Sequence, residues 1–545
     1  MPPNPKSAIQ NPKSGYAPAI LLAALVLLTV GRVCVNEFAG WDDPENISAN
    51  PHYDPPTIRG IAHFWAGPTT GMYIPLPYTM WGGLAYVARL AEPDPSGSRL
   101  NPWVYHTANL LIHLATSLLV LDFLNRITKQ RWAAWFGAAV FAIHPLQVET
   151  VAWATGARDL LCVLFIAAGI NLLARENLRN AKWIYFAAAL ATVLACLSKT
   201  TGVITPALLL VIDVRILHTP WRRALAGLSA SFVIAFGFCI LGMLVQPPIM
   251  EHLAPIWARP LIATDAMTFY LSKLFWPLKL CMDYGRTPDV AIQSRWFFYS
   301  WIVPLLAAII IWFNRRRVPF LVAGALIALI GIAPVLGIVS FNFQAYSTVA
   351  DHYFYPSMLG IAIIIASILE QSRARWMSAA AIAAVLAMSV ISLIDAGYWQ
   401  NVQSLAHHTL EVNPRSFAAY TNLGVDMAHH GDRDGAIEAY QHAIAANPDY
   451  GFAHLDLGML LLDRGDATGA AKEFHELLRI YASQRNADLR LASNVAGVIA
   501  KKLARQNQYQ DAVDMLSDAL NRDPSNEQVA AELEEMRTHV PTTQN

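Results

Sequence analysis

Apolar stretches recur along this chain from position 17 to position 396, and most are about 16–22 residues long. Each is close to the ~20 residues that a helix needs to cross a ~30 Å hydrocarbon layer. The pattern therefore predicts an all-α fold that begins with a polytopic membrane bundle of about eleven spans. These predicted spans begin near positions 17, 103, 132, 159, 183, 203, 224, 297, 318, 357 and 377.

Charge divides the chain into two unequal parts, although the formal net charge is zero over 545 residues. Residues 397–545 carry 20 acidic and 12 basic side chains, whereas residues 1–396 carry 19 acidic and 27 basic ones. Only 14% of all residues are charged, against roughly 25% in an average soluble domain. The composition excludes a disordered chain and argues against a wholly soluble one. We expect a basic membrane domain at 1–396 and an acidic soluble domain at 397–545.

The basic side chains between the predicted spans indicate an orientation, because Lys and Arg are enriched in cytoplasmic loops. With a cytoplasmic N-terminus and an uncleaved first helix, every basic cluster falls on the cytoplasmic side. That arrangement requires an odd number of spans, and it requires 246–296 to stay outside with an interfacial helix at 271–280. The soluble domain then lies outside as well. The clusters are Arg126/Lys129/Arg131, Arg175/Arg179/Lys182, Arg215/Arg222/Arg223, Arg315/Arg316/Arg317 and Arg373/Arg375.

The soluble part repeats itself with the 34-residue period of tetratricopeptide repeats. A leading half-unit at 398–414 precedes three units, the last of them after a short insertion. Stacked repeats of this kind form concave surfaces that hold peptides or protein partners. The repeats could equally be a docking platform without chemistry. The matching positions are Tyr420, Leu423, Gly424, Ala436, Tyr440, Ala443 and Pro448, then His454, Leu457, Gly458, Ala470 and Phe474, then Leu503, Ala512, Leu516, Ala519 and Pro524.

The large outside loop at 36–102 opens with adjacent carboxylates, Asp42 and Asp43, directly after the first predicted span. Mutual repulsion between neighbouring acids raises the pKa of at least one of them. A carboxylate with a raised pKa suits a general base that takes a proton from an attacking group. A helix cap or a solvated acidic loop would account for the same residue types.

Three further groups of ionisable residues fall on the same side of the membrane as that loop. Each alone is often a helix cap or an interfacial anchor, but ionisable groups at membrane helices are functional candidates by default. Their common side suggests a division of labour, in which a carboxylate activates a hydroxyl while cations hold an anionic leaving group such as a lipid-linked phosphate. The groups are His144, Glu149, Arg158 and Asp159, then Ser198 and Lys199, and then Asp351, His352 and Tyr353.

These motifs, in this order, resemble a bacterial membrane-glycosyltransferase family. That family is related to the transmembrane and tetratricopeptide-repeat-containing O-mannosyltransferases. The resemblance covers nearly the whole chain, including the repeats. It rests on Trp41-Asp42-Asp43-Pro44-Glu45-Asn46 with Asn50-Pro51, His144-Pro-Leu-Gln-Val-Glu149, Ser198-Lys199 and Asp351-His352-Tyr353-Phe-Tyr355-Pro356.

The resemblance implies the glycosyltransferase C fold, a polyprenyl-phosphate sugar donor, inversion at the anomeric carbon and a protein Ser/Thr acceptor. It implies a bacterial inner membrane, with the repeat domain periplasmic or extracellular and presenting the acceptor protein. Asp43 or Asp42 would be the general base, and the sugar would be mannose or a similar hexose. Arg158, Lys199 and His352 would contact the donor phosphate. Supporting roles would fall to His144, Glu149, Asp159, Asp351 and Tyr353.

Other functions are compatible with parts of this pattern. The same fold could glycosylate a lipid or a polysaccharide, or the chain could be a non-catalytic membrane scaffold. A transporter is disfavoured because no inverted repeat is evident. No metal-binding motif, phosphate-binding glycine loop or nucleic-acid patch is found, so we expect no metal, no cofactor and no nucleic-acid partner. The five cysteines show no CxxC spacing, which argues against a zinc site.

Overall fold

The computed structural model describes residues 15–94, 97–175, 183–246, 254–372, 374–483, 489–522, 524 and 526–540. Within these ranges the chain is helical, and pairing between extended segments is limited to isolated bridges. Contacts divide it into two compact units, residues 1–247 with 254–408 and residues 248–253 with 409–545. We call the first the membrane unit and the second the repeat unit. Their division after residue 408 lies near the predicted boundary at 396/397.

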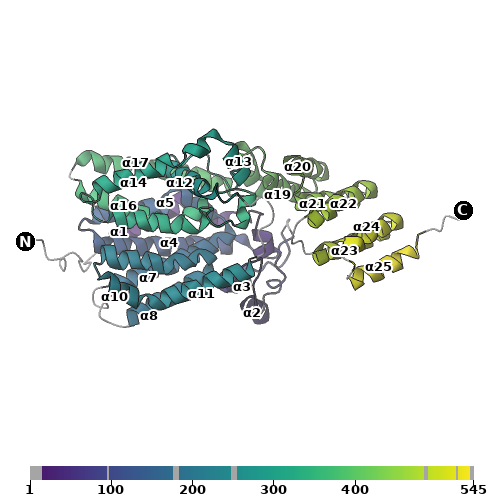
Figure 1. Ribbon diagram of the computed structural model, residues 1–545, viewed down its shortest axis with the longest axis horizontal. Helices are drawn as coiled ribbons and strands as arrows, with labels where there is room; N and C mark the ends of the chain where they lie inside the picture. Colours follow the sequence, from purple (N-terminus) through teal and green to yellow (C-terminus); the bar gives the residue numbers. More distant parts are fainter. Residues whose placement is uncertain are drawn as a thin grey trace, which may run out of the picture. The chain divides into compact units, whose positions relative to one another are not determined.

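The membrane unit holds long helices joined by short helical turns (Figure 1). The helices up to the middle of the unit are α1 (Ala17–Val30), α2 (Ile58–Ala66), α3 (Pro75–Ala88), α4 (Pro102–Ile127), α5 (Arg131–Ile143), α6 (Val148–Ala152), α7 (Ala157–Leu173), α8 (Trp183–Ser198) and α9 (Thr205–Val211). Those that follow are α10 (Trp221–Gly227), α11 (Ser229–Val245), α12 (Arg259–Phe275), α13 (Pro288–Gln293), α14 (Ile302–Asn314), α15 (Leu321–Ile332), α16 (Met358–Gln371), α17 (Arg375–Tyr398) and, at the boundary, α18 (Val402–Val412).

Five helical segments among the described residues are long and apolar enough to cross a membrane. A sixth is added if α10 and α11, which meet at 56°, form one bent span. The described residues therefore contain fewer full-length spanning helices than the eleven that the sequence predicts. Four of the remaining predicted spans correspond to shorter apolar helices, and the one expected near 203 is broken into turns around α9. The five segments are Ala17–Val35, Pro102–Ile127, Ala154–Leu173, Arg295–Asn314 and Arg375–Tyr398.

Neighbouring helices of the membrane unit run side by side, with α4 packed on α5 and α7, and α7 on α8 (Figure 1). The crossing of α15 and α16 depends on two glycines. A Cβ atom on Gly360 would lie 2.2 Å from the Gly324 carbonyl oxygen, and one on Gly324 would lie 2.7 Å from the Gly360 carbonyl oxygen. Small residues at such crossings let helix backbones approach closely in a bundle. Larger residues at either position would therefore push α15 and α16 apart.

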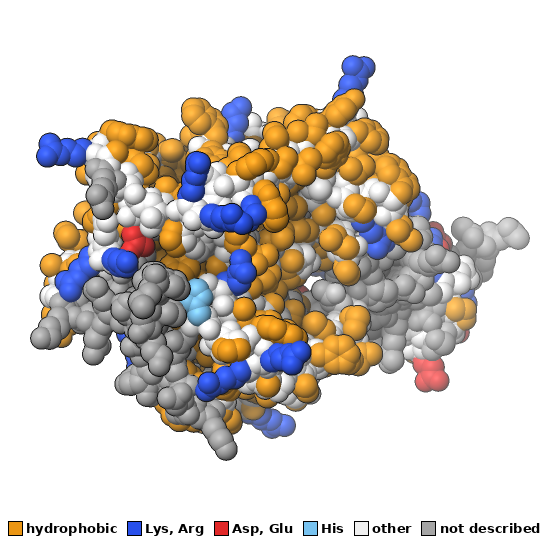
Figure 2. Space-filling view, turned by 60° about the vertical axis from the view of Figure 1, so that its left-hand side comes forward, with side chains coloured by type: hydrophobic (Ala, Val, Ile, Leu, Met, Phe, Trp, Pro, Cys, Tyr) orange, Lys and Arg blue, Asp and Glu red, His pale blue; other side chains and the backbone are white. Residues whose placement is uncertain are grey.

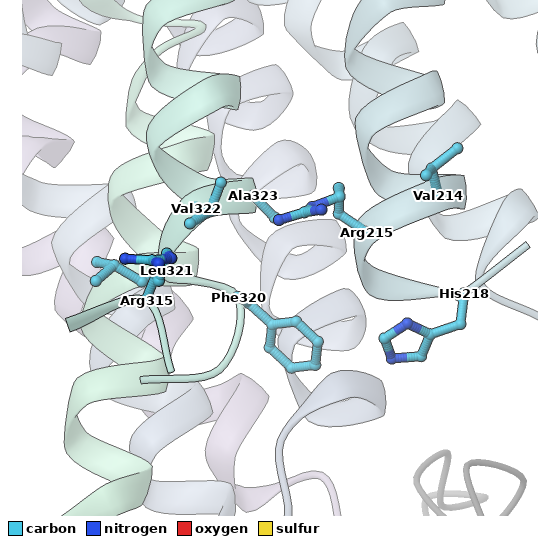
Figure 3. Close-up of a pocket in the computed structure, with 8 residues that line it drawn as sticks. All are labelled: Val214, Arg215, His218, Arg315, Phe320, Leu321, Val322 and Ala323. Atoms are coloured by element: carbon cyan, nitrogen blue, oxygen red, sulfur yellow. The ribbon is translucent and has the colours of Figure 1, made fainter. Parts of the chain in front are cut away.

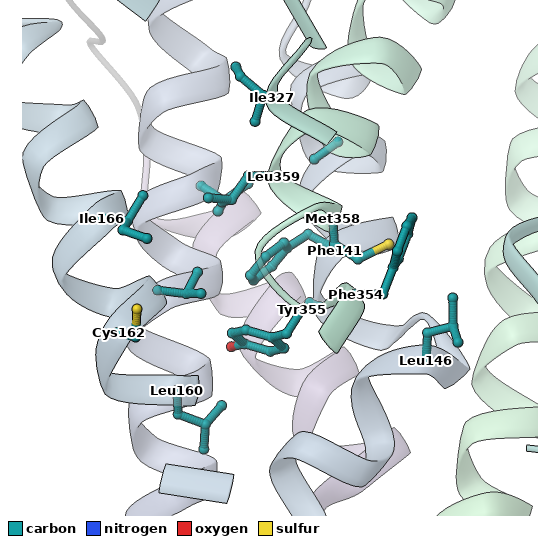
Figure 4. Close-up of a cluster of buried hydrophobic side chains, with 14 of the residues drawn as sticks. Phe141, Leu146, Leu160, Cys162, Ile166, Ile327, Phe354, Tyr355, Met358 and Leu359 are labelled. Atoms are coloured by element: carbon teal, nitrogen blue, oxygen red, sulfur yellow. The ribbon is translucent and has the colours of Figure 1, made fainter. Parts of the chain in front are cut away.

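A dense apolar core lies between α4, α5, α7 and the chain around Tyr355 (Figure 4). Tyr355 is fully buried against Phe141, and its hydroxyl lies 2.9 Å from Nδ1 of His113. Because Tyr355 directly follows the segment Asp351–Phe354, this packing fixes the position of that polar segment. The packing of Tyr355 thus positions the candidate site residues Asp351, His352 and Tyr353.

The outer loop at 36–102 has an apolar core of its own around α2 and α3. Phe64 and Tyr78 stack with their ring centroids 4.3 Å apart. The Tyr78 hydroxyl donates to the Asn46 side-chain oxygen, and the Asn46 amide donates to the Asp42 carbonyl at 2.7 Å. The loop core therefore holds the backbone that carries the two adjacent acids.

The repeat unit consists of helix pairs that pack in chain order, as its 34-residue period predicts. Gly424 lies against the ring of Tyr440, and Gly458 lies against Phe474 in the same way one period later. A Cβ at Gly458 would approach the Phe474 ring to 2.4 Å, so the glycine lets the paired helices meet. The helices are α19 (Phe417–His429), α20 (Arg433–Ala446), α21 (Gly451–Asp463), α22 (Ala467–Ser483), α23 (Leu489–Arg505), α24 (Tyr509–Arg522) and α25 (Glu527–Arg537).

Candidate functional site

The adjacent acids of the outer loop occupy different environments. Asp43 is fully buried, and its two oxygens accept the backbone N–H groups of Ala39 at 3.0 Å and Thr155 at 3.1 Å. The Asp42 side chain is 45% exposed, and its Oδ2 lies 2.7 Å from a guanidinium nitrogen of Arg158. Asp43 therefore holds the loop against the start of the α7 segment, whereas Asp42 can meet a ligand.

The pKa of Asp43 is raised to about 7, chiefly because burial penalises the charged carboxylate. The two backbone hydrogen bonds oppose this shift, and repulsion from Asp42 is the smallest of its causes. The raised pKa agrees with the sequence-based expectation for one of the two acids. Its main cause, however, is burial rather than mutual repulsion between neighbouring carboxylates.

Arg158 and Thr155 join these acids to the first turn of α7. The Nε of Arg158 donates to the Thr155 carbonyl at 3.1 Å, and the guanidinium lies 5.6 Å from the centre of the Trp153 ring. The backbone of Thr155 thus makes two hydrogen bonds: its carbonyl accepts from Arg158, and its N–H donates to Asp43. Gly156 is required beside it, because a Cβ there would lie 2.2 Å from the Thr150 carbonyl oxygen.

A second ion pair lies one residue further along α7. The Nζ of Lys199 contacts both carboxylate oxygens of Asp159, at 2.5 and 2.6 Å, and both side chains are largely buried. Lys199 directly follows the end of α8, and its ammonium lies 5.5 Å from the centre of the Tyr353 ring. The structure therefore brings Lys199, Asp159 and Tyr353 together from three separate segments of the chain.

His352 and Glu149 form a buried hydrogen bond between Nδ1 and Oε1. Burial raises the pKa of Glu149, with further rises from nearby acids. Burial lowers the pKa of His352, as do the charges of Lys199 and Arg158. Oε2 of Glu149 is also buried and has no hydrogen-bond partner among the described residues, which disfavours a charged carboxylate. At neutral pH His352 is consequently uncharged and would meet a phosphate only as a neutral group.

Asp351 accepts hydrogen bonds from the Tyr284 hydroxyl, at 2.8 and 3.0 Å to its two oxygens. Burial raises the pKa of Asp351 to about 7, against the opposing effects of Tyr284 and Lys273. The ammonium of Lys273 lies 5.3 Å from the centre of the Tyr284 ring. Sequence reasoning did not identify Tyr284, because nothing near position 284 links it to a motif 67 residues later.

His144, for which the resemblance implies a supporting role, contacts the backbone through both ring nitrogens. Its Nδ1 accepts the Leu146 N–H at 3.2 Å, and its Nε2 lies 3.1 Å from the Leu274 carbonyl oxygen. Burial lowers the pKa of His144 to about 4, so the ring is neutral. Both ring nitrogens are occupied by the backbone, and His144 therefore shapes the turn between α5 and α6.

Aromatic side chains from several loops surround the charged groups. Trp41 and Tyr346 lie with ring centroids 6.3 Å apart, and Phe343 lies 5.8 Å from Tyr353. Trp153 meets His352 edge-on at 5.8 Å. Flat apolar faces next to hydrogen-bonding groups are typical of small-molecule sites. Over the described ranges, no group of three or more His, Cys, Asp or Glu side chains could hold a metal ion.

Sequence comparisons find relatives that share one name. The chain is 24% identical over 454 residues to the protein O-mannosyl-transferase F38B6.6 of Caenorhabditis elegans, which covers 77% of this chain and 62% of that protein. It is 24% identical over 414 residues to human protein O-mannosyl-transferase TMTC4, covering 62% of this chain and 54% of that one. Human TMTC2 is 26% identical over 258 residues, covering 43% and 30%.

The chain thus spans between about half and three fifths of the length of the first two relatives. No family model matches it. The crystal structure of MamA aligns with 25% of this chain and 70% of its own, at 22% identity and a TM-score of 0.19, too low to support an argument about the fold. The alignments to F38B6.6 and to TMTC4 cover 77% and 62% of this chain. The chain is therefore a relative of the TMTC protein O-mannosyl-transferases.

Proposed function

We propose that this protein is an integral-membrane glycosyltransferase. It moves mannose or a similar hexose from a polyprenyl-phosphate donor to Ser/Thr hydroxyls of a protein. Its relatives carry the name protein O-mannosyl-transferase, and the membrane unit gathers ionisable residues of the kind that such a transfer needs. The reaction is a transfer of the sugar from phosphate oxygen to hydroxyl oxygen.

One observation carries the proposal. The half-exposed carboxylate of Asp42 lies against the guanidinium of Arg158, while buried Asp43 fixes the same loop through Ala39 and Thr155. A group that takes a proton and a group that holds a phosphate must both touch the substrate, at neighbouring points. Asp42 and Arg158 meet that requirement because they are adjacent and held by buried contacts.

In this mechanism Asp42 is the general base and Asp43 is a positioning residue. Asp42 accepts the proton of the Ser/Thr hydroxyl while that oxygen attacks the anomeric carbon. The bond from the anomeric carbon to the phosphate oxygen breaks, and its electron pair leaves with the polyprenyl phosphate. A single displacement of this kind inverts the configuration. Both oxygens of Asp43 are occupied by backbone N–H groups, so it does not reach the acceptor.

Arg158 and Lys199 would stabilise the negative charge that develops on the leaving phosphate. Arg158 has five N–H donors, of which Nε and one Nη2 hydrogen are engaged by Thr155 and Asp42. The remaining donors can meet phosphate oxygens. Lys199 is held by Asp159 and supplies a second positive charge. His352 would add a neutral hydrogen bond, with Glu149, Asp351 and Tyr353 supporting its position.

We further propose that the membrane unit crosses a bacterial inner membrane about eleven times. Its N-terminus would be cytoplasmic, and the site and the repeats would lie outside. The basic clusters between helices support that orientation. The shorter apolar helices are compatible with more spans than their lengths alone suggest, because tilt and local thinning of the bilayer accommodate mismatch. The repeat unit would bind the acceptor protein, as repeat surfaces commonly do.

A transfer assay with purified protein tests the proposal. The donor is polyprenyl-phosphate mannose, and the acceptors are Ser/Thr-containing envelope proteins. Asp42→Asn is expected to lower transfer by about 10²–10⁴-fold, since a general base contributes that much. Glu92→Gln, a change at an exposed acid of the same outer loop, is the matched control. Wild-type rates in Asp42→Asn, or transfer to lipid but to no protein, would contradict the proposal.

A further inference from the structure

A cavity of about 230 Å³ lies in the membrane unit away from the candidate site (Figure 3). Two arginines and a histidine line it, together with the first turn of α15. In Figure 3 the Arg215 side chain extends toward Val322 and Ala323, while His218 and Phe320 lie lower in the view. Drug-sized ligands occupy roughly 300–1,000 Å³, so a cavity of this size suits a smaller polar group.

The cavity and the candidate site lie at opposite ends of the same helices. The chain leaves Lys199, passes through α9 and reaches Arg215 at the cavity. Conversely, α15 begins at the cavity and leads, beyond its last residue Ile332, toward the segment that carries His352. Since α9 and α15 pack against each other, the two sites are separated by the length of this helix pair.

The charges at the cavity are not neutralised by ion pairs. Arg215 is exposed, and its side chain forms no ion pair or hydrogen bond with any described residue. Asp213, two residues earlier, is instead occupied by the hydroxyls of Thr219 at 2.6 Å and Tyr185 at 3.2 Å. Among the described residues, Arg315 donates a hydrogen bond only to the Trp312 carbonyl. Two guanidinium groups therefore retain free donors beside one cavity.

The start of α15 adds backbone donors to the same space. Phe320 precedes the helix in a left-handed conformation, with φ at 58°, and provides no side-chain cap. The N–H groups of Val322 and Ala323 find no acceptor among the described residues. Free N–H groups in the first turn of a helix carry partial positive charge and favour an anion. These N–H groups add to the positive potential of the two arginines, and together they favour a negatively charged ligand in the cavity.

The residues around the cavity are of the types that are common at the depth of lipid headgroups. Trp312, which lies near the end of a candidate span, stacks its ring 3.4 Å from the Arg315 guanidinium carbon. Trp221 begins the bent pair α10–α11, and its ring lies 5.5 Å from Arg222. Tryptophan and arginine gather where membrane helices meet the headgroup region. Figure 2 turns the end of the unit that carries α10 forward, where many Lys and Arg side chains lie among hydrophobic ones.

We propose that this cavity binds the phosphate headgroup of an anionic membrane phospholipid. Arg215 and Arg315 hold the phosphate, His218 and the first turn of α15 line the remainder, and the acyl chains run along the apolar helices outside. Basic pockets between membrane helices bind acidic headgroups in this manner. The inference concerns a lipid of the surrounding membrane and does not depend on the sugar or the acceptor.

Native mass spectrometry of the full-length protein tests the proposal with phosphatidylglycerol as the probe and phosphatidylcholine as the neutral comparison. One phosphatidylglycerol should bind saturably and in preference to phosphatidylcholine. Changing Arg215→Gln together with Arg315→Gln should weaken that binding about tenfold or more, since the phosphate loses its charge-assisted hydrogen bonds to both guanidinium groups. Neither arginine is buried, so the fold should tolerate both changes, and Arg215→Lys provides a conservative variant with an intermediate loss.

The matched control is Arg222→Gln with Arg316→Gln, which removes two exposed arginines that do not line the cavity. It should bind the lipid with nearly wild-type affinity. An equal loss in the control pair would overturn the proposal, because it would show diffuse attraction to the basic surface. Displacement of the lipid by millimolar inorganic phosphate would also overturn it, since a free anion would then be the preferred ligand.

Discussion

Arginine is used differently at the two ends of the membrane unit. At the candidate site, Arg158 is buried and paired with Asp42, and its neighbour Asp159 is paired with Lys199. At the opposite end, Arg215 is exposed and has no acidic partner among the described residues. Pairing inside the protein fixes the geometry of a charge, whereas an unpaired cation at the surface keeps its capacity for an external anion.

The two ends also differ in how much the removal of a charged side chain changes the free energy of unfolding. A buried ion pair has lost its hydration and depends on both partners, so the loss of one leaves a buried charge uncompensated. An exposed arginine remains hydrated, and its removal seldom alters stability by more than about 0.5 kcal/mol. We therefore expect substitutions at the site end to change both activity and stability. Substitutions at the other end should change lipid binding.

Among the variants that compare the arginines of the two ends, the largest effect is expected for Arg158→Gln, which removes the guanidinium beside Asp42. Transfer from polyprenyl-phosphate mannose should fall by about 10²–10³-fold, because a charged donor to the leaving group is lost. Arg158→Lys should restore part of the rate, since it keeps the charge but not the paired N–H geometry. Arg316→Gln at the opposite end is the control. Similar transfer rates in Arg158→Gln and Arg316→Gln would contradict the proposal that only the arginine at the candidate site acts in transfer.

Lys199→Met should give the largest loss of stability. It leaves Asp159 buried without its partner, at a cost of about 3–5 kcal/mol in unfolding free energy. The double variant Asp159→Asn with Lys199→Met should recover much of this loss, because no unpaired charge remains. Thermal unfolding in detergent measures both changes. An unfolding midpoint in Lys199→Met equal to that of Arg215→Met would show that the Asp159–Lys199 pair is not buried as described.

A smaller effect is expected from the titration of Asp43. Its pKa is about 7 in the folded protein, against an ordinary aspartate value of 3.8, so burial disfavours the charged form. The associated stability is present below the unfolded pKa and is lost as pH rises through 7. Between pH 5.5 and 7 the wild type should lose about 1.5 kcal/mol relative to Asp43→Asn, because the slope of about 1.36 kcal/mol per pH unit declines as the carboxyl becomes half ionised at pH 7.

Thermal unfolding of the two proteins across this pH range measures that difference. Other titrating groups are common to both, so the difference isolates Asp43. Asp43→Asn itself should be less stable at low pH, because its amide cannot accept both the Ala39 and Thr155 N–H groups. Parallel curves for the wild type and the variant would mean that Asp43 titrates with an ordinary pKa.

The smallest effect is expected for Glu149→Gln. Because burial raises the pKa of Glu149, an uncharged amide of the same shape should replace it with a stability change of less than about 1.5 kcal/mol. Glu149→Ala should cost more, since it leaves the buried His352 ring without its partner. The unfolding midpoints of the two variants test this order. If Gln is as damaging as Ala, Glu149 is charged in the folded protein.

Sequence reasoning proposed site residues from their type and their place in the chain, and the structure adds the contacts that each of them makes. The acids after the first helix, the start of α7, the residue after α8 and the segment Asp351–Phe354 were each recognisable as polar groups at helix ends. It could not distinguish Asp42 from Asp43, because their exposure depends on a hydrogen bond to Thr155, over a hundred residues away. Nor could it show that both ring nitrogens of His144 are occupied by backbone groups, because one of those groups, the Leu274 carbonyl, is 130 residues away.

The sequence by itself determined the helical fold, the repeats and the end of the membrane unit at which the ionisable motifs gather. These properties follow from local hydropathy, period and helix boundaries, which neighbouring residues set. Only the tertiary structure decided which cation meets which acid, which carboxylate loses its water, and where Arg215 and α15 enclose a cavity. Those properties depend on packing between segments far apart in the chain, and burial in that packing sets the energy of every charge.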